Sequence, residues 1–431
     1  MGKDVMLGVV VLFTICLVWR QGKANRLFRT LLGVTFLYGL VHLLLWAFHP
    51  DLYAKSVMLG TIYNVRLMLF LLLGMGAVLL WPAKFAFSSV IKWTLVVSSV
   101  VAALGVIQYF LPSDTLMHFG YSLERGVRPA FAIDDHPDFP RIMSTLREPN
   151  ALGAYLILPA TALTLLFFRV KDSGRRYLVA GSWLMHALAI FLTFSRSAWL
   201  ALVLSVLLAL WWQHKQRVRN AFKRFWPVMA AGVLLVAIIG LTQRNTTFFQ
   251  QYVVHSNSEE QVADLDSNDY HSLLVKQGLE GVRDNPMGHG PGTAGIVSIQ
   301  NPGGGQLTEN YYIQIAYEVG IVGLGLFVAA NFLLYVLLWR RHDLFGVVLC
   351  ASFWAYVVTN MLLHTWSNEA VAAQWWILAG MGIATTIPSG PELNAKVSQL
   401  AHRAIKAKKP SKSKKSRSAK RKSPPKRTKP A

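Results

Sequence analysis

Long apolar stretches recur along the sequence, and they restrict its fold more than any other feature. A helix needs about 20 mostly apolar residues to cross a bilayer. The runs that approach this length are 4–19, 30–48, 57–80, 89–111, 150–168, 177–194, 197–212, 225–242, 310–339, 345–363 and 370–387. The sequence therefore predicts an all-α polytopic membrane protein with about 11 transmembrane helices.

The composition favours the same class over a soluble globular protein. Hydrophobic residues make up 53% of the chain and charged residues only 15%, with a mean hydropathy of +0.38. The two cysteines, Cys16 and Cys350, both lie within apolar runs, which argues against a disulfide framework or a thiolate metal site. No grouping of His, Cys, Asp and Glu has the spacing of metal ligands, so we expect neither a metal nor a cofactor.

Basic residues between the apolar runs predict the orientation of the chain. The short connectors all carry Lys or Arg; they are 20–29, 81–88, 169–176, 213–224 and 340–344. Because cytoplasmic loops are enriched in these residues, we expect the connectors and the carboxyl terminus to be cytoplasmic and the amino terminus outside. The segments expected on the outer face are 49–56, 112–149, 195–196, 243–309 and 364–369.

Two parts of the chain are expected, a membrane domain over 1–390 and a tail over 391–431. The last 31 residues contain 14 Lys and Arg and no acid, so the tail has too little apolar surface to fold and we expect it to be disordered. Anionic lipid heads are its expected partner. Nucleic acid is disfavoured, because no aromatic residue is interleaved for stacking on bases.

The outer segment 243–309 is too long for a passive connector. Apolar residues at helical spacing over 269–284 predict a short amphipathic helix on the membrane surface. The glycine-rich sequence GHGPG that follows predicts a re-entrant or cap loop, whose backbone can approach a ligand closely.

Several polar residues on the expected outer face are not explained by apolar packing. Arg196, in FSRSAW, lies between two apolar runs, where a guanidinium costs roughly 2.5–3.5 kcal/mol. We expect it to have an anionic partner, although an arginine that reaches the interface from a helix end is an alternative. Arg147 and Asn150 stand before another span, where Asn150 is equally well explained as a helix cap.

A further polar group opens the span 310–339. Glu309 and Asn310 precede its apolar part, and a helix cap is the alternative explanation for Glu309. Glu318 lies about two turns further on, where a buried carboxylate needs a partner or a proton. Arg66, near the middle of the run 57–80, is its expected ion partner.

The order of these motifs resembles the O-antigen ligase and O-antigen polymerase superfamily. The resemblance covers about 145–340 and rests on REPNALGAYL, FSRSAW, RDNPMGHGPG and ENYYIQIAYEVGIVGLGLF in that order. It implies a GT-C-like membrane glycosyltransferase in the inner membrane of a bacterium. Such an enzyme moves a glycan from a polyprenyl diphosphate to a hydroxyl of a glycan, lipid or protein acceptor outside the membrane, with inversion and without a metal or nucleotide sugar.

The resemblance also implies roles for individual residues. Arg196 matches the arginine of the family's Ser-Arg motif and is assigned to the diphosphate, and Arg283 has the same assignment. Further candidates to bind the diphosphate or the glycan are Arg147, Asn150 and Asn310. Arginine binds phosphate oxygens in a bidentate manner. Glu309 stands where many relatives have a histidine regarded as the base, and an ionised carboxylate can take that role. His271 stands where many relatives have an arginine, so it either contacts phosphate or shares the role of base.

Two other kinds of function stay open. Many spans with a few intramembrane charges would also suit a transporter or flippase for a lipid-linked or polar substrate, although no inverted repeat is visible. A scaffold that recruits partners through its basic tail is a weaker possibility. Ligase and polymerase differ only in the acceptor, which the sequence does not reveal.

Overall fold

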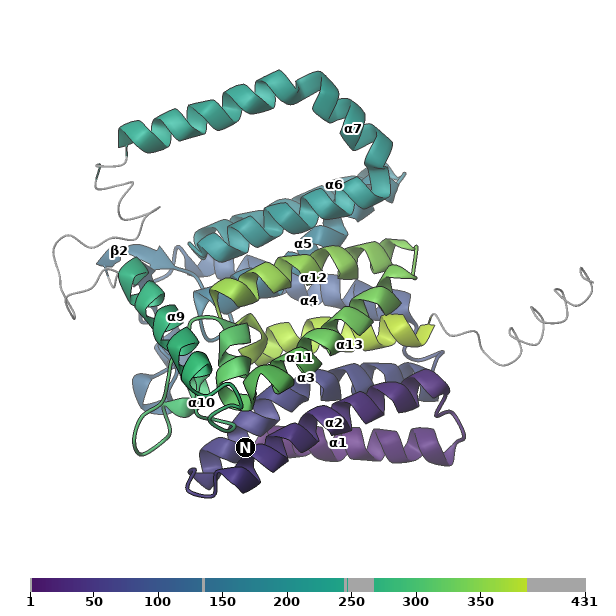
Figure 1. Ribbon diagram of the computed structural model, residues 1–431. Helices are drawn as coiled ribbons and strands as arrows, with labels where there is room; N and C mark the ends of the chain where they lie inside the picture. Colours follow the sequence, from purple (N-terminus) through teal and green to yellow (C-terminus); the bar gives the residue numbers. More distant parts are fainter. Residues whose placement is uncertain (1, 134–135, 244–245, 247–266, 386–431) are drawn as a thin grey trace, which may run out of the picture. The chain divides into compact units, whose positions relative to one another are not determined.

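A computed structural model describes residues 2–133, 136–243, 246 and 267–385, and helices dominate it (Figure 1). The helices are α1 (Gly2–Arg20), α2 (Arg26–Phe48), α3 (Ala54–Leu80), α4 (Phe87–Gln108), α5 (Pro149–Arg169), α6 (Ser173–Leu192), α7 (Arg196–Gln243), α9 (Ser267–Asp284), α10 (Gly295–Ser298), α11 (Tyr311–Trp339), α12 (Leu344–Leu362) and α13 (Glu369–Thr385). Short 3-10 turns are η1 (Thr115–Phe119), η2 (Leu123–Arg125) and η4 (Thr365–Ser367). Strands β1 (Phe131–Ile133) and β2 (His136–Arg141) pair antiparallel.

Eight helices in the described chain are long and apolar enough to cross a membrane. They are α1, α2, α3, α4, α5, the part of α7 up to Asn220, α11 and α12. Large apolar side chains such as Phe13, Phe36 and Trp93 are exposed on them, as lipid-facing residues would be. The prediction of an all-α polytopic membrane protein is confirmed, while a count of 11 spans stays a prediction.

The connector expected at 213–224 is helical instead. The runs 197–212 and 225–242 are parts of one 48-residue helix, α7, which breaks at His214 with φ −134° and ψ 35°. The intervening sequence is rich in Lys, Arg and Gln, which are good helix formers, so a polar stretch alone does not end a helix. The amphipathic helix expected over 269–284 is confirmed as α9.

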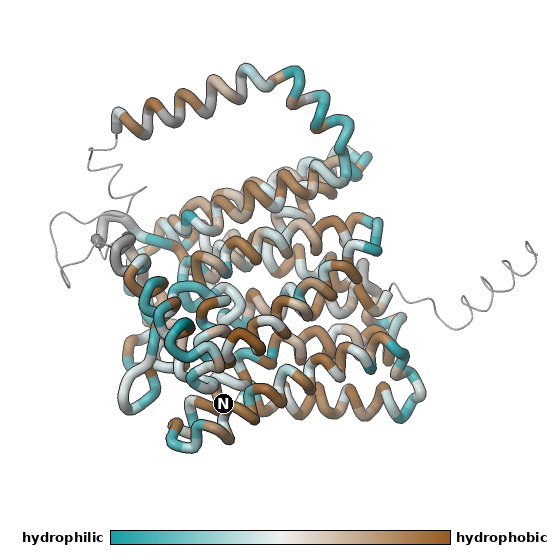
Figure 2. The backbone as a smooth tube through the Cα atoms, in the orientation of Figure 1, coloured by the Kyte–Doolittle hydropathy of each residue, from teal (hydrophilic) through white to brown (hydrophobic). Residues whose placement is uncertain are grey.

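The helices present hydrophilic residues mainly at their two ends (Figure 2). In Figure 1 the connectors α1–α2, α3–α4, α5–α6 and α11–α12 lie at one end, and the hairpin, α9 and α10 lie at the other. Contacts agree with this arrangement, since Lys23 Nζ in the first connector donates to the carbonyl of Leu80 at the end of α3 at 3.0 Å. The basic connectors therefore share one end, as the charge pattern predicts.

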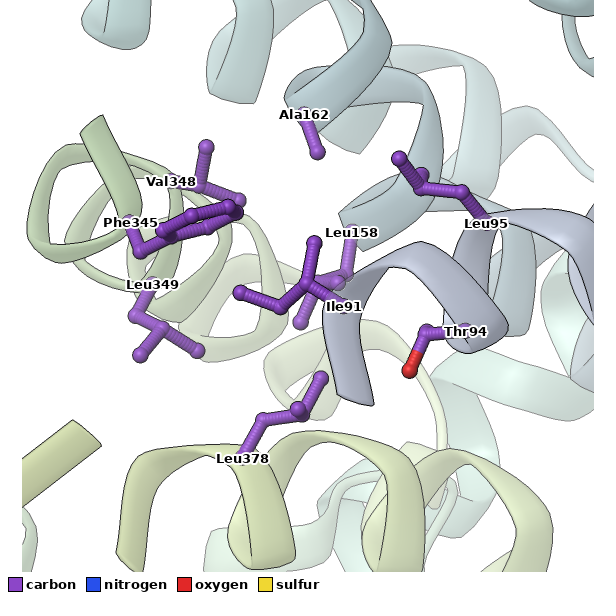
Figure 3. Close-up of a pocket in the computed structure, with 9 residues that line it drawn as sticks. All are labelled: Ile91, Thr94, Leu95, Leu158, Ala162, Phe345, Val348, Leu349 and Leu378. Atoms are coloured by element: carbon purple, nitrogen blue, oxygen red, sulfur yellow. The ribbon is translucent and has the colours of Figure 1, made fainter. Parts of the chain in front are cut away.

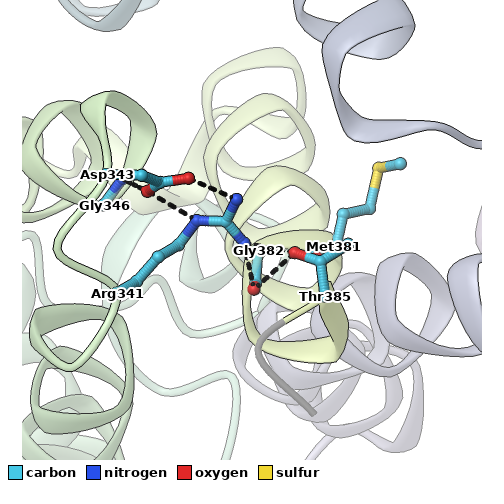
Figure 4. Close-up of polar contacts among 6 residues, drawn as sticks. All are labelled: Arg341, Asp343, Gly346, Met381, Gly382 and Thr385. Atoms are coloured by element: carbon cyan, nitrogen blue, oxygen red, sulfur yellow. Dashed lines mark hydrogen bonds and ion pairs between the residues drawn. The ribbon is translucent and has the colours of Figure 1, made fainter. Parts of the chain in front are cut away.

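Arg341 fastens the end of α13 to the α11–α12 connector (Figure 4). Its Nη1 donates to the carbonyl of Gly382 at 2.7 Å and to the Thr385 hydroxyl. Its Nε and Nη2 donate to the two carboxylate oxygens of Asp343 at 2.8 and 2.6 Å, and Asp343 also caps α12 by accepting from Gly346 N at 2.9 Å. A cation at the carbonyl end of a helix is favoured by the helix dipole, so this contact stabilises α13.

An apolar cavity lies among α4, α5, α12 and α13 (Figure 3). Thr94 is the one polar side chain among its nine lining residues, and its hydroxyl already donates to the carbonyl of Val90 at 2.9 Å. The lining therefore offers no polar group to orient a ligand, and we interpret the cavity as a gap in helix packing.

Helix α11 is broken where the glycine-rich loop 286–292 meets it. The break lies at Val319 and Gly320, and Gly320 has φ +70°. The loop fills the break with main-chain hydrogen bonds, which are His289 N to Tyr317 O at 2.8 Å, Gly290 N to Glu318 O at 2.9 Å and Ile321 N to Pro286 O at 3.0 Å. The predicted glycine-rich loop thus packs its backbone directly against the helices.

Replacing Gly320 by Ala is expected to destabilise the protein. A side chain at φ +70° is strained, and its Cβ would lie 2.5 Å from the backbone of Met287 and 2.8 Å from the carbonyl oxygen of Pro286. We expect the free energy of unfolding to fall by roughly 1–3 kcal/mol. Thermal unfolding in detergent measures this. Gly325→Ala on the same helix, where a Cβ meets nothing within 4 Å, is the control; equal melting temperatures of the two variants would contradict the expectation.

Candidate functional site

Arg196 begins α7 immediately after a tight turn that ends α6. Phe194 in this turn has φ +50°, and Ser195 N donates to the Thr193 hydroxyl at 3.2 Å. Trp199 folds back on the turn: its ring stacks on Phe191 at 5.3 Å and its Nε1 donates to the carbonyl of Ile190 at 3.0 Å. The motif FSRSAW is therefore a rigid joint, and it places the exposed Arg196 at a helix amino terminus.

Arg141, which the sequence reasoning missed, connects this joint to α5. Its Nε donates to the carbonyl of Thr193 at 2.9 Å, and its Nη2 donates to Asn150 Oδ1 at 3.0 Å. Asn150 is therefore not the helix cap considered above, because Glu148 occupies the N-cap position of α5. The hydrogen bonds place Asn150 and the FSRSAW joint around one guanidinium.

A half-buried carboxylate, that of Glu148, lies beside this guanidinium. Burial raises the pKa of Glu148, the nearby charge of Glu309 raises it further, and Arg141 lowers it. The charge of Glu309 acts on Glu148, so the structure brings the start of α5 and the start of α11 together. No sequence motif predicted a role for Glu148, although it adjoins Arg147 in REPN.

Glu309 precedes α11 and is not its cap. Asn310 is the cap, because its Oδ1 accepts from Tyr312 N at 2.9 Å and Ile313 N at 3.0 Å. Glu309 itself has φ +48° and its Oε2 lies 3.4 Å from His271 Nδ1 on α9. Burial raises the pKa of Glu309, and the neighbouring His271 lowers it. The structure thus brings together two residues that are 38 positions apart in the sequence.

His364 adds a neutral imidazole to the same cluster. Its Nε2 lies 3.2 Å from the Thr308 hydroxyl, which itself donates to the carbonyl of Asn310 at 3.2 Å. The hydroxyl must therefore accept from Nε2–H, which leaves Nδ1 with its lone pair. Burial, with a smaller effect of His271, lowers the pKa of His364 to about 4. The sequence shows His364 only as an isolated histidine in an outer loop.

The segment 180–328 matches the family model described as O-antigen ligase. This segment is similar to the O-antigen ligase family. The match includes Arg196, His271, Arg283 and Glu309 and stops short of Arg147. No curated protein sequence matches the chain. Together with the apolar helices, the family indicates a bacterial membrane protein of the O-antigen ligase and polymerase type.

The other two predicted arginines, Arg283 and Arg147, do not contact Glu309 in the described part of the chain. Arg283 is exposed near the end of α9, about 18 Å along the helix axis from His271 at 1.5 Å per residue. Arg147 is exposed in the segment before α5 and lines a cavity with residues of α1, α3 and α10. Among the three arginines assigned to the substrate, Arg196 is the one at the FSRSAW joint, which Arg141 contacts.

Arg66 and Glu318, expected as an ion pair, have separate partners. Glu318 accepts from Asn64 Nδ2 at 2.7 Å, from Gly292 N at 3.0 Å and from Ala294 N at 3.4 Å. Arg66 donates to the carbonyl of Ser367 and lies over the ring of Tyr63 at 3.9 Å. Neutral donors, which are the Asn64 amide and two main-chain N–H groups, thus take the place of the expected cation.

Backbone strain occurs in the segments that form the candidate site. Among the residues that the structure describes, three that are not glycine have a left-handed backbone: Ser144, Phe194 and Glu309. Ser144 is held by Gln108, whose Oε1 accepts from its N–H at 2.7 Å. Such conformations cost about 1–3 kcal/mol each and cluster at functional sites. Their positions in the segment before α5, in the FSRSAW joint and at the start of α11 agree with the site described here.

Proposed function

We propose that the protein transfers a glycan from a polyprenyl diphosphate to an acceptor hydroxyl, with inversion and without a metal. The observation that carries the proposal is the convergence of Arg141, Glu148, Glu309 and His271 beside the joint that presents Arg196. This end of the helices is opposite the basic connectors, which supports a site on the outer face, with the amino terminus outside and the carboxyl terminus cytoplasmic. The location would be the inner membrane.

The proposed reaction begins with the acceptor hydroxyl. Glu309 takes its proton as the hydroxyl oxygen forms a bond to the anomeric carbon, and the bond from that carbon to the diphosphate oxygen breaks. The leaving diphosphate keeps the electron pair. Arg196 would neutralise the charge that grows on it, aided by the amino terminus of α7, because helix amino termini attract anions. Attack opposite the leaving group inverts the anomeric centre.

His271 has a defined task in this proposal, which is to keep Glu309 ionised. A positive charge 3.4 Å from the carboxylate favours the charged form and opposes the effect of burial. Asn310 and Asn150 have structural roles in this proposal and are not assigned to the substrate. Asn310 caps α11, and Asn150 accepts a hydrogen bond from Arg141. His364, which is neutral and contacts the Thr308 hydroxyl, is available for a hydrogen bond to the acceptor.

The pH dependence of transfer tests this arrangement. The pKa of Glu309 is raised, and the base must be ionised, so kcat/KM should fall as the pH is lowered through that pKa. In His271→Ala the carboxylate loses its positive neighbour, its pKa rises further, and the fall should begin at a higher pH. The exposed His118 provides the control variant, His118→Ala. An unchanged or lower midpoint in His271→Ala would contradict the assigned role.

The direct test of function uses the purified protein in nanodiscs. A polyprenyl-diphosphate oligosaccharide is supplied with candidate acceptors, and both the free lipid diphosphate and new glycosidic bonds are measured. Diphosphate release with new bonds supports the proposal; a ladder of products would identify a polymerase and a single adduct a ligase. An intact donor with every acceptor would contradict it.

A transporter for a lipid-linked substrate is the second candidate, and the break in α11 favours it. Transporters bind substrates at interrupted helices, and here the interruption adjoins the buried Glu318. Reconstituted vesicles distinguish the two candidates. Movement of the lipid-linked glycan across the bilayer without bond formation would favour transport.

The tail lies outside the described residues. Anionic lipid heads remain its proposed partner, and nucleic acid remains disfavoured, on the basis of the sequence alone.

A further inference from the structure

A cavity of about 430 Å³ lies beside the segment that carries Glu148. Its walls come from the start of α1, the start of α3, the segment before α5 and the short helix α10. The lining residues are Lys3, Asp4, Lys55, Leu59, Tyr63, Arg147, Ile296, Val297 and Gln300. This volume is within the range of about 300–1,000 Å³ that is typical of small-molecule sites.

Basic side chains outnumber acidic ones on the lining, with three Lys or Arg and one Asp. Lys3 pairs with Glu369, and the buried Asp4 has an interaction of its own. Lys55 and Arg147 are both exposed, and no residue in the described ranges forms an ion pair with either. Lys55 and Arg147 therefore face this cavity outside any ion pair with a described residue, and Asp4 is the one acidic side chain on the lining.

Helix stability does not explain the position of Lys55. It lies in the first turn of α3, which begins at Ala54. The amino terminus of a helix is the positive end of its dipole, where a lysine is disfavoured and an anion is favoured. A negatively charged ligand would remove this conflict.

The remaining lining suits a sugar. Tyr63 and Gln300 provide hydrogen-bonding groups for hydroxyls, and Leu59, Ile296 and Val297 provide apolar surface. We propose that the cavity binds an acidic sugar unit, one that carries a carboxylate or a phosphate, with Lys55 and Arg147 contacting the anionic group. That the ligand is a glycan rests on the proposed function. Arg147 adjoins Glu148, so the bound unit would lie next to the carboxylate cluster.

Binding measured without transfer tests the proposal. Glucose 1-phosphate, glucuronic acid and glucose are titrated against the full chain in uncharged detergent, with ligand-observed NMR as the readout. The acidic sugars should bind more tightly than glucose, and Lys55→Gln should weaken them roughly tenfold, the value of one charge-assisted contact. Binding of glucose should not change. Lys84→Gln, in the connector after α3, is the matched control.

Three outcomes would overturn the subsite: equal binding of glucose and the acidic sugars, an unchanged affinity in Lys55→Gln, or the same loss in Lys84→Gln. The result is separable from the proposed function, because binding of the free acidic sugars is measured without a donor and does not require transfer. If the wild type binds the acidic sugars but transfers no glycan, the proposed transferase function is contradicted and the proposed subsite is not.

Transfer assays identify the source of the acidic unit. A donor with an acidic glycan is paired with a neutral acceptor, and the reverse pair is also assayed. Lys55→Gln should lower the rate of transfer for the donor–acceptor pair whose acidic sugar binds in the cavity. Equal rates of wild type and Lys55→Gln with both pairs would overturn the subsite.

Discussion

Replacing Glu309 by Gln is expected to lower kcat for glycan transfer by roughly 10²- to 10⁴-fold, the usual contribution of a general base. The amide has almost the same size and can still accept a hydrogen bond, but it cannot take the proton of the acceptor hydroxyl. The strained backbone at φ +48° and the contact with His271 at 3.4 Å give Glu309 a fixed position for this task. Initial rates of diphosphate release measure the loss.

Glu280→Gln is the matched control for this variant. Glu280 is an exposed carboxylate on α9 that pairs only weakly with Lys276, at 4.0 Å and one helical turn away. It should retain full activity. If Glu309→Gln transfers glycan at the rate of Glu280→Gln, the base is another group, and His364 with its free Nδ1 lone pair is the next residue to replace.

Replacing Arg196 by Ala is expected to lower kcat by roughly 10²- to 10³-fold, as when one charge-stabilising group is removed from an active site. The diphosphate gains negative charge as the glycosidic bond breaks, and a guanidinium stabilises that charge more than it stabilises the bound donor. Arg196→Lys should restore part of the rate, because it keeps the charge and loses the bidentate geometry. The KM for the donor should rise in both variants.

Arg169→Ala controls for the loss of an exposed arginine elsewhere. Arg169 lies at the other end of α5, away from the candidate site. Because Arg196 is exposed and begins its helix, Arg196→Ala should be inserted and folded, which its melting temperature checks. A folded Arg196→Ala variant with wild-type kcat would refute the role in charge neutralisation.

The helices could be predicted from the sequence because each depends on its own apolar composition. The run 57–80, for example, lies within α3, which begins only three residues earlier. The exact caps could not be predicted. Glu309 and Asn150 were the candidates, but the N-cap positions are held by Asn310 and Glu148. Capping depends on local dihedral angles, and a sequence pattern locates a helix end only to within one or two residues.

The candidate site could be predicted only in part, because its contacts join distant segments. The charge of Arg196 and its place between two apolar runs were visible in the sequence. The role of Arg141 was not visible, since it depends on a hydrogen bond to Thr193, 52 residues away. The partners of Glu318 were equally hidden, because two of them are main-chain N–H groups that no residue type reveals.

The join between the glycine-rich loop and α11 has a consequence for how pH profiles are interpreted. The three hydrogen bonds that fill the break run from main chain to main chain, so they carry no titratable group. These main-chain bonds are therefore insensitive to pH over the range in which Glu309 changes charge. The carboxylate of Glu318 also holds the loop, through Gly292 N and Ala294 N. Any pH-dependent change in the loop would therefore begin at these side-chain contacts and not at the main-chain join.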